Sequence, residues 1–122
     1  MVRNVGGRVT QEVINDVAFI GQMAEIMLPD GPLFEVAVIH HTQCGAGALA
    51  DDAFRRRFAE RIGADESILR EHAVLDPIAT VTDDVERLRS AGAISPRIAV
   101  SGYVYDVLDG LVQTVLPAAA CS

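Results

Sequence analysis

The chain is organised around one apolar segment, Phe34 to Ile39, which ends abruptly in the residues His-His-Thr-Gln-Cys-Gly. A continuous, β-branched run of this kind is typical of a strand buried on both faces, and ligands of open α/β sheets gather at the carboxyl ends of such strands. Here that end carries two imidazoles and a thiol, which are side chains that zinc prefers. The stretch therefore predicts a central strand with a candidate metal site at its end.

Length and composition limit the class of protein. A chain of 122 residues can bury a single core, so we expect one domain covering residues 1–122. Half of the residues are hydrophobic, which excludes disorder as the overall state. No apolar run reaches the roughly 18 residues of a membrane-spanning helix, and the N-terminus has no signal-like apolar segment. We therefore expect a cytoplasmic protein.

The charge balance narrows the possible partners. The formal net charge is −7, and every basic residue is an arginine. Nucleic acids and anionic membranes both need a basic surface, so neither is expected as a partner. The one cationic cluster, Arg55-Arg56-Arg57, lies in a helical pattern next to acidic residues. A solvated helix face is favoured there over a phosphate site.

The N-terminal half predicts strand, helix and strand in that order. Met1 to Val5 has the pattern of a strand end, and the glycine pair after it allows a turn. Thr10 is a suitable N-cap for a helix running to about Leu28. Its expected apolar stripe consists of Val13, Ile14, Val17, Ile20, Ala24 and Met27. With the strand from Phe34 to Ile39, this makes a βαβ unit with a right-handed crossover.

The C-terminal half predicts three helices and a hairpin. The first helix is capped by Asp51 or Asp52, presents Phe54, Phe58 and Ile62 on one face and stops at Gly63. The second is short and runs from Glu66 to His72, with Asp65 as its cap. The third is capped by Thr82, has Asp83 and Asp84 in its first turn and ends at Gly92. The chain then forms a strand from Arg97 to Tyr105 and an antiparallel strand from Leu111 to Leu116. Residues Pro117 to Ser122 are expected to fray. The fold class is α/β, a mostly parallel β-sheet flanked by helices, with an antiparallel edge strand from the C-terminal hairpin.

The spacing H-x-x-C makes His41 and Cys44 the candidate metal ligands, because two donors three residues apart in a loop can reach one ion. Strand alternation should point His40 and His41 to opposite faces, so that one ligates while the other is structural. A hydrogen-bonded core histidine remains the plain alternative, and His72 is expected at the surface. A catalytic zinc site needs three protein ligands, and Cys121, in the tail, is a poor third candidate. The residues alone support half of a zinc site.

Three motifs in order carry a family resemblance. They are Arg3-Asn4-Val5-Gly6-Gly7, then Ile39-His40-His41-Thr42-Gln43-Cys44-Gly45, then Gly102-Tyr103-Val104-Tyr105-Asp106 with Asp109-Gly110-Leu111. Together they make the chain resemble the beta-class carbonic anhydrases over nearly its whole length. Members of that family hydrate carbon dioxide reversibly to bicarbonate at a zinc ion held by two cysteines and a histidine.

The resemblance assigns roles to particular residues. It implies that His41 and Cys44 are zinc ligands, and that Asn4, Gly6 and Gly45 line a small pocket for carbon dioxide. It also implies a homodimer or a higher homo-oligomer.

The chain departs from the family at its N-terminal side. The family's other cysteine ligand and its Asp-Arg dyad lie in a C-x-D-x-R motif on a strand that precedes the Arg3 to Gly7 motif, and this sequence does not contain them. The resemblance thus implies an N-terminally truncated domain with no catalytic dyad residue of its own. A homodimer cannot restore the motif, because every copy lacks it.

In the family the absent strand lies between the one ending near Val5 and the one from Phe34 to Ile39. If this strand is missing, we expect one of three outcomes: the two flanking strands move together, another chain occupies the space between them, or the protein begins upstream of Met1. Three hypotheses follow. The first is a carbonic anhydrase whose 122-residue chain alone is inactive or very weak. The second is a catalytically silent relative that acts as a structural or oligomeric module, and the third is incidental zinc binding at two ligands.

Overall fold

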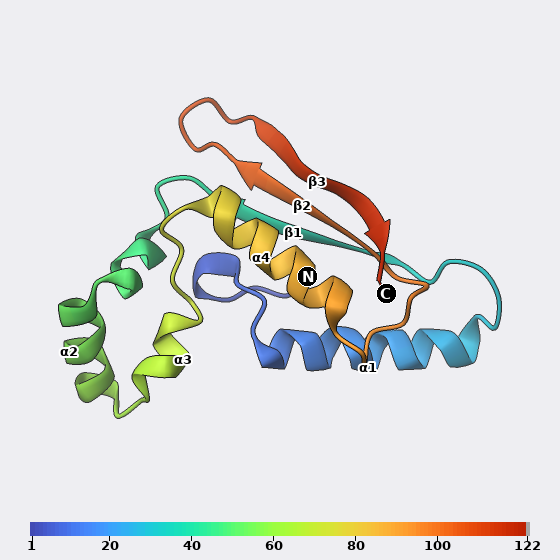
Figure 1. Ribbon diagram of the computed structural model, residues 1–122, viewed down its shortest axis with the longest axis horizontal. Coiled ribbons are helices and arrows are strands. Elements are labelled where there is room, and N and C mark those ends of the chain that lie inside the picture. The colour runs from blue at the N-terminus through green and yellow to red at the C-terminus, as the bar shows by residue number, and fades with distance from the viewer. Residues whose placement is uncertain (122) are drawn as a thin grey trace.

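A three-stranded mixed sheet forms the centre of the computed structural model, which describes residues 1–121 (Figure 1). Strand β1 (Glu35–His41) pairs in parallel with β2 (Ala99–Tyr105), and β2 pairs antiparallel with β3 (Val112–Ala120). The strand order is β1-β2-β3. The expected fold class, an α/β sheet flanked by helices with an antiparallel edge strand from the C-terminal hairpin, is confirmed.

Helix α1 (Gln11–Met27) begins where its cap predicts, because the Thr10 hydroxyl accepts a hydrogen bond from the Val13 N–H at 3.4 Å. Its buried side consists of Ile14, Val17 and Gly21. The expected apolar stripe was only partly right, since Ile20 and Met27 are exposed.

Residues 1–10, which precede α1, form no strand. Residues 1–4 have no regular structure, and Val5–Gly7 form a single 3-10 turn, η1, in which Gly6 has a φ of 82° and Gly7 a φ of 66°. These left-handed conformations turn the chain sharply, which ends any extended run before it can pair. The predicted strand end at Met1 to Val5 is therefore wrong, and the opening βαβ unit does not form in the described residues.

Helix α2 (Asp52–Ile62) has the predicted cap at Asp51 and the predicted stop at Gly63, which adopts a φ of 67°. Phe54, Phe58 and Ile62 recur along one side of the helix as predicted, and that side is exposed. Arg55, which was expected on a solvated face, is buried.

Arg55 is held by three neighbours, so it is not part of a solvated face. It donates to the Leu49 carbonyl at 2.9 Å, bonds Asp52, and pairs with Glu66 at 3.4 Å. The leucine belongs to η2 (Gly45–Ala50), the 3-10 segment that follows the β1 tip. The other two arginines of the cluster, Arg56 and Arg57, are exposed as predicted.

Helix α3 (Glu66–Arg70) is capped by Asp65 and is two residues shorter than predicted. His72 lies beyond it and is half-buried, because its Nδ1 donates to the Val5 carbonyl at 3.0 Å. The expected surface position of His72 is thus only partly right. This hydrogen bond ties the N-terminal turn to the segment after α3.

Helix α4 (Pro77–Ser90) begins five residues before the predicted cap. The Asp76 carboxylate accepts from the Ile78 N–H at 3.1 Å, and Pro77 occupies the first turn, where its missing N–H costs nothing. Thr82 lies inside the helix and donates to the Ile78 carbonyl at 2.8 Å. The Asp76-Pro77 pair therefore starts this helix, and Thr82 does not cap it.

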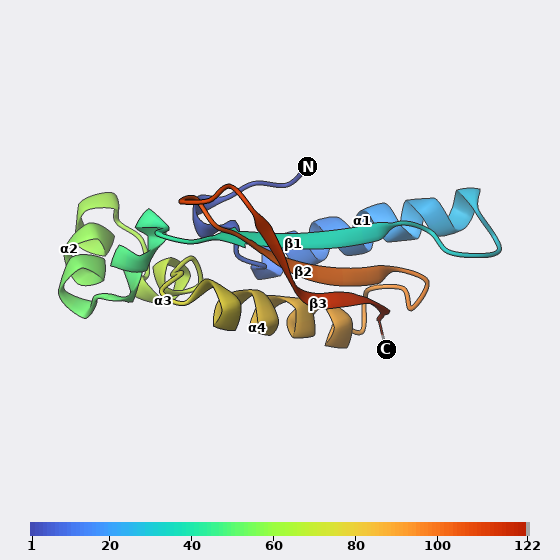
Figure 2. The same cartoon turned by 90° about the horizontal axis from the view of Figure 1, so that it is seen from above.

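The core lies between α4 and the sheet, and Figure 2 shows α4 running along the strands. Val81, Val85 and Leu88 are fully buried there. The closest approach is at Gly102 of β2, where an added Cβ would come within 2.9 Å of Val85 Cγ2. A larger residue at this position would push α4 away from the sheet.

The C-terminal strand is longer than predicted. It reaches Ala120, and the Cys121 N–H donates to the Ile98 carbonyl at 3.0 Å. Cys121 is only 4% exposed and packs in the main core, so the tail does not fray through that residue. Pro117 is tolerated because β3 is an edge strand. Ser122, the last residue of the predicted tail, lies outside the described residues.

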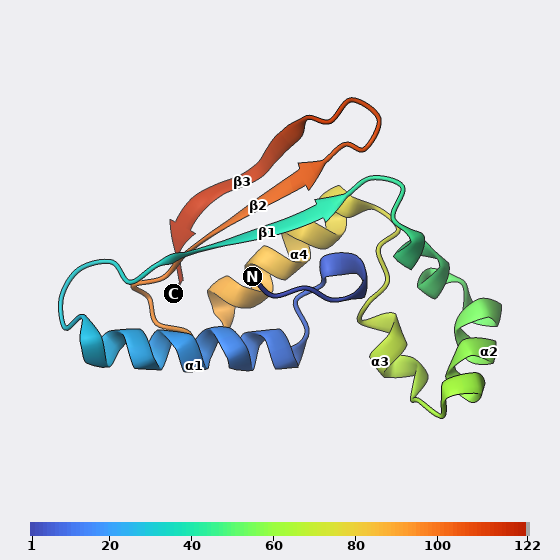
Figure 3. The same ribbon diagram turned by 180° about the vertical axis from the view of Figure 1, so that it is seen from behind.

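Strand β1 forms the other edge of the sheet, as Figure 3 shows from behind. The Thr42 N–H donates to the Tyr105 carbonyl at 2.9 Å, so alternate residues of β1 turn their backbone groups toward β2. The groups of Glu35, Ala37, Ile39 and His41 point to the open side, where no strand of residues 1–121 pairs with them.

Burial along β1 alternates, with its outward side chains exposed and Val38 and His40 buried. The expected burial on both faces is wrong for this strand. The predicted pairing of the N-terminal segment with β1 is not found either, because residues 1–4 form no strand beside β1.

No helix in the described part of the chain is long and apolar enough to cross a membrane.

Candidate functional site

The two histidines at the end of β1 point to opposite faces, as strand alternation predicts. His40 is 1% exposed, whereas His41 is exposed. One imidazole is therefore structural, and the other is available for chemistry.

His40 is held in the core by three polar groups. Its Nε2 lies 3.0 Å from the Gly7 carbonyl and 3.3 Å from Asp84 Oδ2, and its Nδ1 lies 2.8 Å from Thr80 Oγ1. Both neighbours of Nε2 are acceptors, so Nε2 carries a hydrogen, and Nδ1 is hydrogen-bonded to the Thr80 hydroxyl, which also donates toward the Asp76 and Pro77 carbonyls. His40 thus connects the N-terminal turn, the end of β1 and α4.

Asp84 is the centre of this buried network and is 1% exposed. Arg8 approaches it with two nitrogens, at 2.8 and 3.1 Å, and the Val9 N–H donates to it at 2.9 Å. Burial alone would raise the pKa of Asp84, but the hydrogen bonds from His40, Arg8 and Val9 outweigh burial and hold the pKa below its ordinary value. Asp84 is therefore a charged structural anchor.

Sequence reasoning missed this anchor because it placed Asp84 in the first turn of a helix. A contact between residues 76 positions apart leaves no local signal in the sequence.

His41 has the arrangement of an oriented ligand. Its Nδ1 donates to the Thr42 carbonyl at 2.8 Å, so in the neutral imidazole Nε2 is the nitrogen left to bind a metal. Metal-bound histidines commonly use their second nitrogen in this way. The side chain is exposed, so Nε2 is accessible.

Cys44 is a free, half-buried thiol three residues after His41. Between them Gln43 takes a φ of 53°, the sole positive φ of a non-glycine residue among residues 1–121. Such a conformation is uncommon outside glycine and occurs often at functional turns. The chain therefore reverses tightly between the two candidate donors.

The described residues do not fit a complete catalytic zinc site, which needs three protein ligands. No group of three or more His, Cys, Asp or Glu side chains placed to hold a metal occurs within residues 1–121. The Cys121 N–H donates to the carbonyl of Ile98, just before β2 begins, whereas His41 lies beside Tyr105, the last residue of β2. The thiol of Cys121 thus lies at the opposite end of the sheet (Figure 1), and burial raises its pKa.

The three residues expected to line a carbon dioxide pocket have different surroundings. Asn4 donates through Nδ2 to the Arg8 carbonyl at 2.8 Å, and its buried Oδ1 has no partner in the part of the chain that the structure describes. Gly6 packs tightly, since an added Cβ would lie 3.2 Å from Ala46 Cβ. Gly45 is exposed and faces open space. The structure thus brings Gly6 against η2, directly after Cys44.

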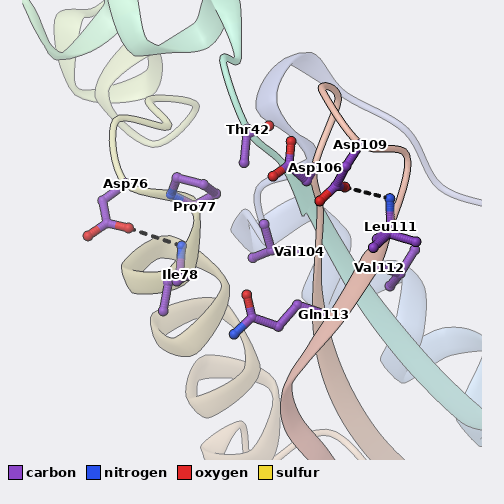
Figure 4. A pocket seen from close by; sticks show the side chains of 10 residues that line it. All are labelled: Thr42, Asp76, Pro77, Ile78, Val104, Asp106, Asp109, Leu111, Val112 and Gln113. Carbon is purple, nitrogen blue, oxygen red and sulfur yellow. Dashed lines mark hydrogen bonds between the residues drawn. The ribbon is translucent and has the colours of Figure 1, made fainter.

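An open cavity of about 410 Å³ lies near the strand ends, and Figure 4 shows its lining. It is formed by Thr42, Asp76, Pro77, Ile78, Val104, Asp106, Asp109, Leu111, Val112 and Gln113. Neither His41 nor Cys44 lines it. Its three carboxylates each accept a hydrogen bond from a nearby backbone N–H, so they stabilise the start of α4 and the β2–β3 turn.

Comparison with known proteins gives consistent relatives. No family model matches the chain. It is 26% identical over 117 residues to Beta-carbonic anhydrase 1 of Mycobacterium bovis and of Mycobacterium tuberculosis, an alignment covering 96% of this chain and 67% of each relative.

Two solved structures share the fold. The carbonic anhydrase from Streptococcus mutans superposes with a TM-score of 0.71 at 30% identity, covering 93% of this chain and 64% of that one. The carbonic anhydrase from Glaciozyma antarctica gives a TM-score of 0.66 at 25% identity, covering 93% of this chain and 65% of that one. The chain thus spans about two thirds of the length of its relatives. The resemblance expected from its motifs is confirmed, and the chain is similar to beta-class carbonic anhydrases in both sequence and fold.

Proposed function

We propose that this chain is one beta-carbonic-anhydrase-like domain that contributes His41 and Cys44 to a zinc site for the reversible hydration of carbon dioxide to bicarbonate. The observation that supports this most is His41 itself, exposed at the carboxyl end of β1 with Nδ1 tied to a carbonyl and Nε2 free. The half-buried thiol of Cys44 follows three residues later. Residues outside the described chain would have to complete the ligand set and supply acid–base chemistry.

We also propose a cytoplasmic protein that works as a homo-oligomer. The two cysteines are both free thiols, which suits a reducing compartment. The open edge of β1 and the exposed apolar helix faces favour association with another chain.

A catalytically silent structural module is the second candidate. It is favoured by the absence of a third donor near His41 within residues 1–121. The buried Asp84 network and the His40–Gly7 bond hold the end of β1 through protein groups of this chain, which suits a structural role.

A chimera separates the two candidates. It joins the N-terminal portion of a mycobacterial beta-carbonic anhydrase 1, with the family's C-x-D-x-R strand, to Met1 of this chain. If the chain contributes working ligands, the chimera should show zinc-dependent hydration by stopped-flow, and both His41→Ala and Cys44→Ser should abolish it. A folded chimera with no rate above buffer would favour the silent module.

The 122-residue chain alone should hydrate carbon dioxide no faster than buffer in stopped-flow measurements with added zinc. The physical reason is the incomplete ligand set, since two donors leave the ion largely hydrated and exchangeable. A zinc-dependent rate above background that disappears in His41→Ala would contradict this expectation.

Zinc affinity provides a separate measurement on the same chain. Competition with a chromophoric chelator should reveal weak binding that drops roughly tenfold or more in His41→Ala and in Cys44→Ser. The matched controls are His72→Ala and Cys121→Ser, which remove the same donor types elsewhere and should leave the affinity unchanged. Equal loss in the controls would show that the binding is not at the β1 tip.

A further inference from the structure

Helix α1 carries a second apolar stripe on the side away from the core. Phe19, Ile20, Met23, Ile26 and Met27 are each between 48% and 75% exposed. They recur at helical spacing, opposite the buried Ile14, Val17 and Gly21. A helix that is apolar on both sides is typical of one buried on both sides, so this outer stripe indicates a contact with another molecule.

Helix α2 carries a shorter stripe of the same kind. Phe54, Phe58 and Ile62 are exposed at i, i+4 and i+8, and the two rings stack with centroids 6.2 Å apart. Arg57 and Arg61 lie on the same face, beside a shallow depression that these arginines and phenylalanines line. This face is therefore apolar along its centre and cationic along one side.

The charges of the two helices are opposite. Helix α1 contains Glu12, Asp16 and Glu25 and no basic residue. Helix α2 contains four arginines against Asp52 and Glu60. Packing α1 on another α1 would bring like charges together, whereas packing α1 on α2 brings opposite charges together.

The two stripes lie too far apart to meet within one molecule, since α1 and α2 occupy opposite ends of it in Figures 1 and 2. We propose that the outer stripe of α1 in one copy packs on the Phe54–Ile62 face of α2 in a second copy of this chain. This inference is independent of carbon dioxide hydration.

The dimensions of the two faces agree. Residues 19–27 and 54–62 each span about 12 Å at the helical rise. Antiparallel packing places the N-terminal half of α1, with its exposed Asp16, at the C-terminal end of α2, where Arg61 lies. The same orientation aligns the two helix dipoles favourably.

Analytical ultracentrifugation of the full chain over a concentration series tests the contact with two variants, Met23→Glu on α1 and Phe58→Glu on α2. Each should raise the dissociation constant roughly tenfold or more, because each buries an unpaired carboxylate in the contact. Leu108→Glu is the matched control: this side chain is 78% exposed in the β2–β3 turn, on neither helix, and the change adds the same charge. Circular dichroism and thermal unfolding establish that each variant remains folded.

Mixing the two variants gives the decisive result. Met23→Glu keeps its α2 face and Phe58→Glu keeps its α1 face, so the mixture should form a one-to-one heterodimer at concentrations where each variant alone is mostly monomeric. The charge pair gives a second readout: Asp16→Arg and Arg61→Asp should each weaken association, and a chain with both changes should regain it.

Three results would overturn the proposal. They are a wild-type chain that stays monomeric throughout the series, a Phe58→Glu variant that associates as well as wild type, and a mixture that forms no heterodimer. Loss of association in Ala37→Pro while both helix variants still associate would likewise overturn it, by assigning the contact to the edge of β1.

Discussion

Replacing Asp84 by asparagine should lower the free energy of unfolding by about 3 kcal/mol, because it removes a buried carboxylate that is paired with the partly buried Arg8 guanidinium. The carboxamide has nearly the same volume, so the loss reports on charge and hydrogen bonding, with little contribution from packing. Two donors from Arg8 and the Val9 N–H all converge on this carboxylate. Urea unfolding followed by circular dichroism measures the change.

Asp83→Asn is the matched control, since the Asp83 carboxylate lies on the same helix as Asp84 but is exposed. It should change the free energy of unfolding by less than about 0.5 kcal/mol. Similar losses in the two variants would mean that the Asp84 network contributes little to stability.

The effect of Asp84 should depend on pH in a defined direction. Its folded-state pKa is lowered, so its contribution is fully present above the unfolded-state pKa of about 3.9 and is lost as pH falls through the folded-state pKa. The difference in stability between wild type and Asp84→Asn should therefore shrink only below about pH 4. A difference that shrank at neutral pH would indicate another titrating group.

The second large effect is expected at Gly6, where alanine should lower the free energy of unfolding by about 2–4 kcal/mol. Gly6 has a φ of 82°, which is unfavourable for any residue with a Cβ. An added Cβ would also lie 2.5 Å from the His72 carbonyl oxygen, a backbone atom that cannot move alone. Thermal unfolding and urea titration measure the loss.

Gly45→Ala provides the comparison for Gly6. Nothing lies within 4 Å of a Cβ at Gly45, and its φ is not positive, so alanine should cost no stability. If both variants were equally stable, the turn at Gly6 would not be constrained as the structure indicates.

Local signals predicted the elements that depend on neighbouring residues. The caps at Thr10, Asp51 and Asp65 and the stop at Gly63 are all found, because each acts within one helical turn. The opposite directions of His40 and His41 follow from strand geometry alone.

The failures concern which side of an element faces the core. Periodicity located the Phe54, Phe58 and Ile62 face correctly, but it cannot tell a core-facing stripe from an outward-facing one. The C-terminal tail was misjudged for a similar reason, since pairing of Cys121 with Ile98 depends on a distant strand. The predicted roles of Asn4, Gly6 and Gly45 remain predictions.

The parallel pairing of β1 and β2 has a consequence for how the chain folds. Glu35 pairs with Ala99, so residues 64 positions apart in the sequence must meet before the first β1–β2 hydrogen bond forms. The β2–β3 hairpin closes over a short turn and can form early, with α4 docking on it. Attachment of β1, and with it the ordering of His41 and Cys44, is then the slow event, because distant pairings form last. The candidate ligands thus become ordered only in the final stage of folding.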